Sequence, residues 1–321
     1  MTSIERTAYP RFTRAPSVKE LRELYTPTPT DLAFVATTAR GPAQKFGLMI
    51  LLKVYQRLGY FPKPETIPGA IISHIRAVMQ FPADLVPDIA SNHTLYRYYA
   101  AIRAHLEIQS EGKHIRHVAA RAIHQAAQVM ENPADLISAA IEVLVKEQCE
   151  LPGFSTLQRM ARRIRNLVNR GLYQRVADGL SEAEQQALLR LISREGTETF
   201  TAFNRIKEAP RSATLTHLDE WLSRLTWLQS LGNMHPVVEG IPYAKVKHLA
   251  EEARSLHATN LWDIAAPKRL ALLVCLIAQA QVSTRDEILQ MFTKRMSKLT
   301  TRAKEELERL REGGSPSLRA M

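Results

Sequence analysis

Arginine, asparagine, glutamine and serine recur at helical spacing between residues 151 and 175, in LPGFSTLQRMARRIRNLVNRGLYQR. Arginine binds phosphates and guanine edges, asparagine and glutamine bind adenine edges, and serine binds either. From 151 to 180, six arginines stand against one acid, Asp178, which gives a local net charge of +5. The stretch therefore predicts contact with a nucleic acid. The candidate contacts are Ser155, Thr156, Gln158, Arg159, Arg162, Arg163, Asn166 and Arg170.

One helix must position these side chains. Pro152 and Gly153 break the chain, and Ser155 and Gln158 can cap each other's backbone N–H groups, so we expect the helix to begin at Ser155. At about 100° per residue, its polar face also includes Asn169, and an apolar stripe including Leu167 faces the core.

A second helix precedes it, with Asn132 as its cap and Pro133 at its first position. A helix, a short Pro-Gly turn and a basic helix are typical of a helix-turn-helix DNA-binding unit. The alternative is an ordinary two-helix corner with solvated arginines, because arginine is a good helix former.

The stretch TLYRYYAAIRAHLE, residues 94–107, supplies a second and weaker set of candidate contacts: Tyr96, Arg97 and Arg103. The periodicity places them outward or at the flank of a helix, beside Ala100, whose small side chain would let the helix approach a groove closely. A plain amphipathic helix fits the same pattern.

The whole chain of 321 residues carries a net charge of +11, with a pI near 9.8, which favours a polyanionic partner. Cys149 and Cys275 lie far apart with no CxxC pattern, which argues against a disulfide scaffold and fits a reducing cytoplasm. The first residues contain no apolar run, and the most apolar segment, 270–280, is too short to span a bilayer. We expect a cytoplasmic, nucleoid-associated protein with no membrane partner.

Nearly every segment has helical periodicity and none alternates as a strand, so the expected fold is all-α and multi-domain. Leucines at 215, 218, 222, 225 and 228 predict a packing seam, and 232–242, with two glycines and two prolines, is the expected linker. The expected domains are a DNA-binding domain at 1–130, a helix-turn-helix-like DNA-binding domain at 131–231, and a helical scaffold at 232–321.

Catalytic and metal-binding patterns are missing from the sequence. Five of the ten histidines fall between His93 and His124, but their spacing matches no standard zinc motif, and solvated or phosphate-facing histidines are expected. No phosphate-binding, dinucleotide-binding, zinc-protease or serine-hydrolase motif occurs. We expect no cofactor, no metal and no enzymatic activity.

Six runs of the chain resemble the N-terminal region of the large replicative transposases of the Tn-three family. The resemblance extends over about residues 10–311. The runs begin at FTRAPSVKELRELYTP, FGLMILLKVYQRLG, TLYRYYAAIRAHL, ENPADLISAAIEVLVKEQ, TAFNRIKEAPRSATL and APKRLALLVCLIAQ.

The resemblance implies a function for each part. In that family the N-terminal domains bind the terminal inverted repeats of the transposon, and a later RNase-H-like domain with an acidic triad cuts DNA with magnesium. No counterpart of the acidic domain is found here, and GGSPSLRAM after Glu312 does not resemble the family's continuation, so we expect a chain truncated before the catalytic domain.

The expected partner is therefore double-stranded DNA at transposon ends. A second copy of the chain or a full-length transposase is a further candidate partner. In the alternative function, the chain is a helical interaction module that docks onto full-length transposase and modulates transposition.

Overall fold

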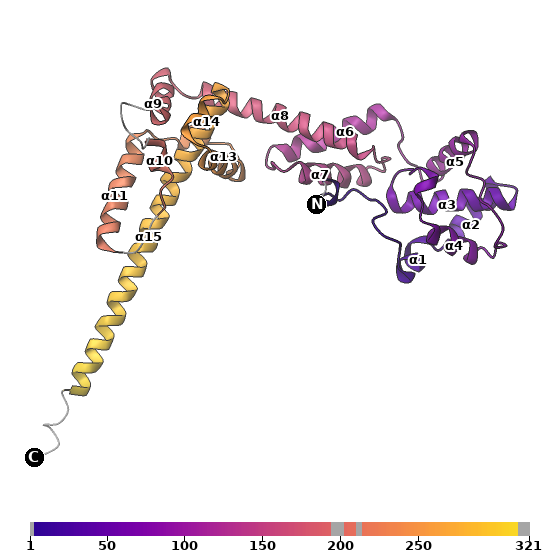
Figure 1. Ribbon diagram of the computed structural model, residues 1–321, viewed down its shortest axis with the longest axis horizontal. Helices are drawn as coiled ribbons and strands as arrows, with labels where there is room; N and C mark the ends of the chain where they lie inside the picture. The colour runs from indigo at the N-terminus through magenta and orange to yellow at the C-terminus, as the bar shows by residue number, and fades with distance from the viewer. Residues whose placement is uncertain (1–2, 194–201, 210–213, 314–321) are drawn as a thin grey trace, which may run out of the picture. The chain divides into compact units, whose positions relative to one another are not determined.

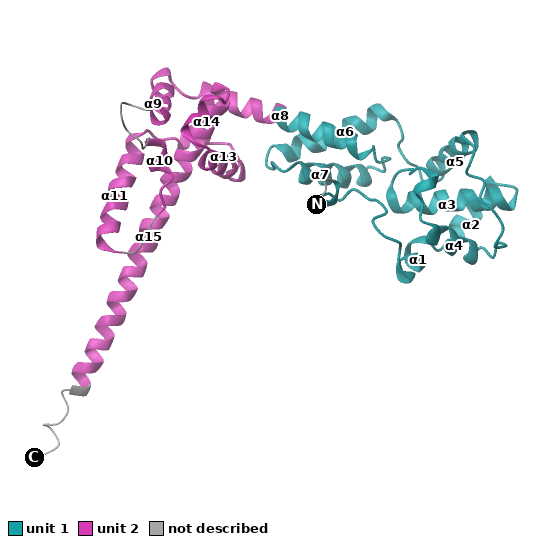
Figure 2. Ribbon diagram, viewed as in Figure 1, with its two compact units in different colours: residues 1–166 teal, residues 167–321 magenta. Residues whose placement is uncertain are grey.

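A computed structural model describes residues 3–193, 202–209 and 214–313. Every regular element within these ranges is a helix, so the all-α prediction is confirmed (Figure 1). One isolated β-bridge joins Gln109 to Cys149. The chain forms two compact units, residues 1–166 (unit 1) and 167–321 (unit 2) (Figure 2).

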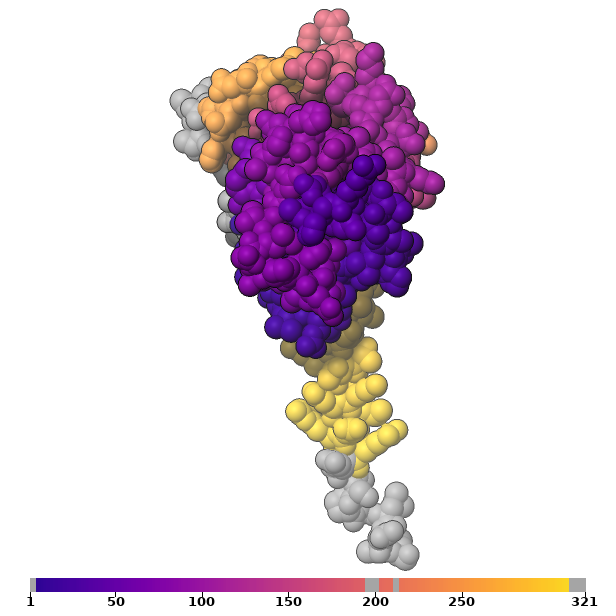
Figure 3. Space-filling model, turned by 90° about the vertical axis from the view of Figure 1, so that its right-hand side faces the viewer, coloured from indigo at the N-terminus to yellow at the C-terminus, as the bar shows by residue number. Residues whose placement is uncertain are grey.

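In the first part of unit 1, four helices pack around the apolar helix α3. The helices are α1 (Val18–Tyr25), α2 (Pro29–Thr38), α3 (Pro42–Leu58), α4 (Gly69–Val78) and α5 (Asn92–His105). Ser17 and Thr28 form capping boxes with Glu20 and Asp31, and Gly59 ends α3 in the left-handed region, as their residue types predict. Apolar side chains of α3, among them Phe46, Ile50 and Val54, form the core of these helices. Figure 3 shows the outer surface of the N-terminal helices in indigo and purple.

Unit 1 continues with α6 (Gly112–Ala127), α7 (Pro133–Lys146) and the first part of α8 (Phe154–Asp178). The side chain of Asn132 accepts a hydrogen bond from the amide of Ala134 at 3.1 Å, which confirms the predicted cap of α7. The predicted start of α8 at Ser155 is wrong. Gly153 already offers its carbonyl to the amides of Thr156 and Leu157, at 2.8 and 3.3 Å, so the helix begins at Phe154 and Ser155 lies inside its first turn.

Unit 2 is built around the first half of α15. It contains the rest of α8, then α9 (Glu182–Ile192), α10 (Ala202–Ile206), α11 (Leu215–Ser230), α12 (His235–Val238), α13 (Tyr243–Ser255), α14 (Ala258–Trp262) and α15 (Ala266–Gly313). The predicted buried segment Leu270–Ala280 lies in the core of this unit. Among the described helices, none combines the length and the apolar character needed to cross a membrane.

The units differ from the three expected domains, because both expected boundaries fall inside a unit. Helices α6 and α7 pack together across residue 131. The expected linker, 232–242, contains α12 and is held by Gln281 of α15, which donates to the carbonyls of Leu228 and Gly232 at 2.9 and 2.8 Å.

Three further expectations need correction. Leu167 is exposed, and Asn169 is buried and accepts a 2.7 Å hydrogen bond from Lys245 of α13. The predicted leucine seam packs only in part: Leu228 is fully buried, whereas Leu215 and Leu222 are exposed. The sequence also predicts a Gly-Thr-rich loop at 196–199 and a helix that starts at Arg211, and these positions lie outside the described residues.

Candidate nucleic-acid interface

The N-terminal part of α8 has one buried face and one basic, polar face. Leu157 and Ala161 are fully buried in unit 1. Because successive residues of a helix turn by about 100°, the polar residues of this segment lie together on the opposite face. Its exposed members are Ser155, Arg159, Arg162, Arg163 and Asn166, and Thr156 and Gln158 are half-buried beside them. We call Arg159, Arg162, Arg163 and Asn166 the α8 face.

The neighbouring Arg165 differs from the arginines of the α8 face. Its Nη1 donates to the backbone carbonyl of Glu131 at 3.3 Å, so its side chain is turned back onto the loop before α7. Arg170, another predicted contact, is exposed, but it belongs to the part of α8 that lies in unit 2.

Helix α5 presents a second narrow surface in unit 1. Leu95, Tyr98 and Ile102 bury one side of the helix. Tyr96, 70 % exposed, lies on the other side with Arg97 and Ala100, and we call these three residues the α5 stripe. The Tyr96 ring lies edge-on to that of Tyr99, with centroids 6.3 Å apart, and the Arg97 guanidinium lies 5.6 Å from the centre of the Tyr98 ring. Burial raises the pKa of Tyr98 above its ordinary value, so its phenol stays neutral.

Arg103, the remaining predicted contact on α5, is half-buried and paired with an acid. Its Nε and Nη2 donate to the two carboxylate oxygens of Glu150 at 2.6 and 3.1 Å, and its guanidinium lies 5.2 Å from the centre of the Phe61 ring. This bidentate geometry makes Arg103 a structural link between α5 and the segment before α8.

That segment, residues 147–153, joins α7 to α8 and is longer than the three- or four-residue turn of a helix-turn-helix unit. The amide of Gln109 donates to Gln148, and the amide of Glu150 donates back to Gln109, at 2.9 and 3.0 Å. The amide of Leu151 donates to the carbonyl of Gly59 at 2.8 Å. This connector between α7 and α8 is therefore bonded to the chain just after α3 and just after α5.

The N-terminal segment also holds this connector. The Tyr9 hydroxyl donates to the carbonyl of Pro152 at 3.2 Å, and the Tyr9 ring meets that of Phe154 edge-on, 5.6 Å between centroids. Burial raises the pKa of Tyr9 well above its ordinary range, so this donor keeps its proton. Together these contacts fix the start of α8 relative to α5.

The sequence-based prediction did not single out α6 as a basic surface. This helix contains no acidic residue, and a face of cationic and imidazole side chains is exposed on it: Lys113, His114, Arg116, His117 and His124. The signal in the sequence was the same helical spacing that identified α8. Arg121 of α6 pairs with Glu147 of the connector.

All five histidines between 93 and 124 are exposed, and His105 stacks on Phe34 with ring centroids 4.0 Å apart. Within the described ranges, no group of three or more His, Cys, Asp or Glu side chains is arranged to hold a metal ion.

Comparisons with known proteins bear on these surfaces. The family model described as "Domain of unknown function (DUF4158)" matches residues 1–164. The chain is 23 % identical over 287 residues to the transposase for transposon Tn2501 of Escherichia coli, which covers 88 % of this chain and 29 % of that protein. It is 21 % identical over 290 residues to the transposase for transposon Tn501 of Pseudomonas aeruginosa, and 24 % identical over 303 residues to the transposase for transposon Tn21 of E. coli, covering 90 % of this chain in both cases. The chain spans about 29 % of the length of these relatives.

Proposed function

The chain belongs to the DUF4158 family and is related to transposases of the Tn-three type, and from this premise we propose that it binds the terminal inverted repeats of a transposon as the DNA-recognising part of a transposase. The family match at 1–164 nearly coincides with unit 1, and unit 1 carries both the α8 face and the α5 stripe.

The observation that carries this proposal is the α8 face. Three arginines and an asparagine are exposed on a helix whose opposite side is buried at Leu157 and Ala161, so the fold holds them in place without covering them. Arginine and asparagine make the bidentate contacts that distinguish guanine and adenine in the major groove. The same arginines also neutralise phosphates, which contributes most of the sequence-independent affinity.

The α5 stripe supplies a second contact in this proposal. Ala100 leaves room for the helix backbone to approach the duplex, and Tyr96 and Arg97 flank it. The connector between α7 and α8 joins the two surfaces through Arg103 and Glu150, which favours a duplex that contacts both at once.

We further propose that the chain binds DNA without cleaving it. Two-metal cleavage needs several carboxylates around one site, and the sequence offers no acids at an interpretable spacing. Incubation with supercoiled plasmid and magnesium should leave the plasmid intact. Magnesium-dependent nicking by the purified chain would contradict this part of the proposal.

Sequence preference tests the proposal directly. The purified chain is titrated against a labelled duplex carrying the inverted repeat of the transposon that encodes it, beside a scrambled duplex of equal length, across a salt series. We expect a preference of about tenfold or more for the repeat that persists at moderate salt. Equal binding to both duplexes that falls steeply with salt would reduce the function to a basic surface.

A further inference from the structure

The second half of α15 carries an apolar seam that its own unit leaves exposed. Residues at alternating spacings of four and three share one side of a helix, as in a heptad. On α15 this spacing gives Arg285 and five apolar residues. The five apolar residues are all exposed, and we call them the α15 seam: Val282, Leu289, Phe292, Met296 and Leu299. The distal, yellow part of α15 presents its side chains to solvent in Figure 3.

Helix α11 lies antiparallel to α15 and extends this apolar surface. The indole N–H of Trp221 donates to Glu287 at 2.7 Å, and Gln281 reaches the carbonyl of Leu228, so residue numbers rise along α11 as they fall along α15. At about 100° per residue, Leu215 and Leu222 of α11 then point to the same side as the seam. Both are exposed, so the seam and α11 together form one apolar face.

The other edge of α11 is covered by α10. Arg224 of α11 is buried there and donates to the carbonyls of Arg205 and Ile206. The apolar face therefore lies on the open edge of the α11–α15 pair.

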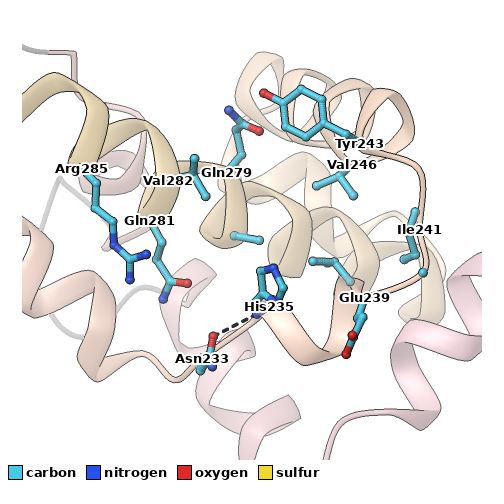
Figure 4. Close-up of a pocket in the computed structure, with 13 residues that line it drawn as sticks. Asn233, His235, Glu239, Ile241, Tyr243, Val246, Gln279, Gln281, Val282 and Arg285 are labelled. Carbon is cyan, nitrogen blue, oxygen red and sulfur yellow. Dashed lines mark hydrogen bonds between the residues drawn. The ribbon is translucent and has the colours of Figure 1, made fainter.

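A cavity of about 440 Å³ continues the seam toward the start of α15 (Figure 4). Ala278, Val282 and Arg285 line it from α15 and precede Leu289 at the same spacing of four and three. Ile241 and Val246 form its apolar side opposite α15, and Asn233, His235 and Glu239 also line it (Figure 4). A cavity of this size takes a large apolar side chain.

Asp286 and Glu287 lie near the start of the seam, but along its distal part, from Leu289 to Leu299, every charged side chain is basic. Between residues 288 and 304 the sequence has five basic residues and no acid: Lys294, Arg295, Lys298, Arg302 and Lys304. Lys294, Lys298 and Arg302 are exposed on the part of α15 that bears the seam. A chain that packs on the seam therefore gains most if its own flanks are acidic.

We propose that the α15 seam binds an amphipathic helix of another protein chain, with an apolar heptad face, acidic flanks and one large apolar side chain inserted in the cavity. A heptad seam is complementary to a second heptad seam, and a cavity at its end gives the anchor that such helix-in-groove contacts use. A second copy of α15 fits less well, because pairing would bring two basic stretches together.

The test uses the full chain and two synthetic helical peptides of about four heptads, both with leucine at the seam positions. One peptide has glutamate and the other lysine at the flanking positions. Fluorescence anisotropy should show the glutamate peptide binding at least about tenfold more tightly than the lysine peptide. Leu289→Ala and Phe292→Ala should each weaken that binding about tenfold.

Leu167→Ala is the matched control, because Leu167 is as exposed as Leu289, at 65 % against 63 %, and lies on another helix of the same unit. It should leave peptide binding unchanged. Absence of binding, equal binding of the two peptides, or an equal loss in Leu167→Ala would overturn the proposal. Sedimentation showing a dimer that Leu289→Ala dissociates would also overturn it and make a second copy the occupant.

Discussion

A buried ion pair shows how single residues hold unit 1. Lys53 of α3 donates to Asp31 of α2 at 3.2 Å, and both side chains are almost completely buried. Asp31 also accepts from the amide of Thr28 at 2.8 Å and from Gln56 at 2.9 Å. From the sequence, either Thr28 or Thr30 could cap α2, and the structure has Thr28. The partner at Lys53 depends on how α2 packs on α3, which no local pattern encodes.

Asp31→Asn should therefore destabilise unit 1, because it leaves the Lys53 ammonium buried without its counter-charge. Loss of one partner of a buried pair costs about 3–5 kcal/mol. Urea unfolding measures this loss, with Asp84→Asn, an exposed carboxylate, as the control. Wild-type stability of Asp31→Asn at neutral pH would contradict the prediction.

The same pair predicts a dependence on pH. Burial alone would raise the pKa of Asp31, but the hydrogen bonds from Thr28 and Gln56 and the charge of Lys53 outweigh it and lower the pKa. Because the folded pKa lies below the unfolded one, this stabilisation is present above the unfolded pKa and is lost as pH falls through the folded pKa. The difference in the free energy of unfolding between wild type and Asp31→Asn should therefore become smaller as the pH falls. A difference that stays constant with pH would contradict this assignment.

Substitutions at Arg103 can show whether this predicted contact binds DNA directly or only stabilises the fold. Arg103→Ala should lower stability because it leaves Glu150 half-buried and unpaired. The exchange Arg103→Glu with Glu150→Arg should recover part of the stability. If Arg103 only positions the connector, DNA affinity measured by anisotropy should recover with it. Affinity that stays low in a stable exchange variant would mark Arg103 as a direct DNA contact.

At the scale of elements, helix starts and ends followed from capping residues, as at Ser17, Thr28, Asn132 and Gly59. The start of α8 did not, because a glycine carbonyl began the helix where a serine cap was expected. The face of α8 was predicted correctly as far as Asn166 in terms of exposure. Beyond it Arg170 is exposed as expected, but Leu167 is exposed and Asn169 is buried, against the prediction. Asn169 bonds to Lys245, which lies 76 residues away in the sequence.

The α5 stripe gives a prediction about shape. Ala100 is exposed, so Ala100→Trp should leave the free energy of unfolding unchanged within about 0.5 kcal/mol. If α5 enters a groove, the indole should block its approach and lower DNA affinity about tenfold or more. Ala36→Trp, an exposed alanine on α2 of the same unit, is the matched control for added bulk. Unchanged affinity in Ala100→Trp would remove α5 from the interface.

At the scale of the whole molecule, the sequence predicted the helices, whereas the two compact units have other bounds than the expected domains. The division between the units falls at 166, inside α8, where neither proline nor glycine marks a boundary. The glycines and prolines of 232–242, which predicted a linker, instead shape a packed segment that Gln281 holds in unit 2. Composition detects breaks in helices, whereas the grouping of helices depends on contacts between distant residues.

The two units carry separate surfaces, so their proposed activities should be separable. Substitutions on the α15 seam should leave DNA binding unchanged, because the α8 face and the α5 stripe lie in unit 1. Loss of inverted-repeat binding in Phe292→Ala, with the fold intact, would contradict this division of roles.

The most direct test of the central claim is the affinity of the full chain for the inverted repeat after one charge is removed from the α8 face, in two separate variants. Arg159→Ala and Arg162→Ala should each cost about 1–3 kcal/mol of binding free energy. Arg22→Ala, an exposed arginine of α1 in the same unit, is the matched control and should cost much less. Wild-type affinity in both α8 variants, or an equal loss in Arg22→Ala, would contradict recognition of DNA by the α8 face.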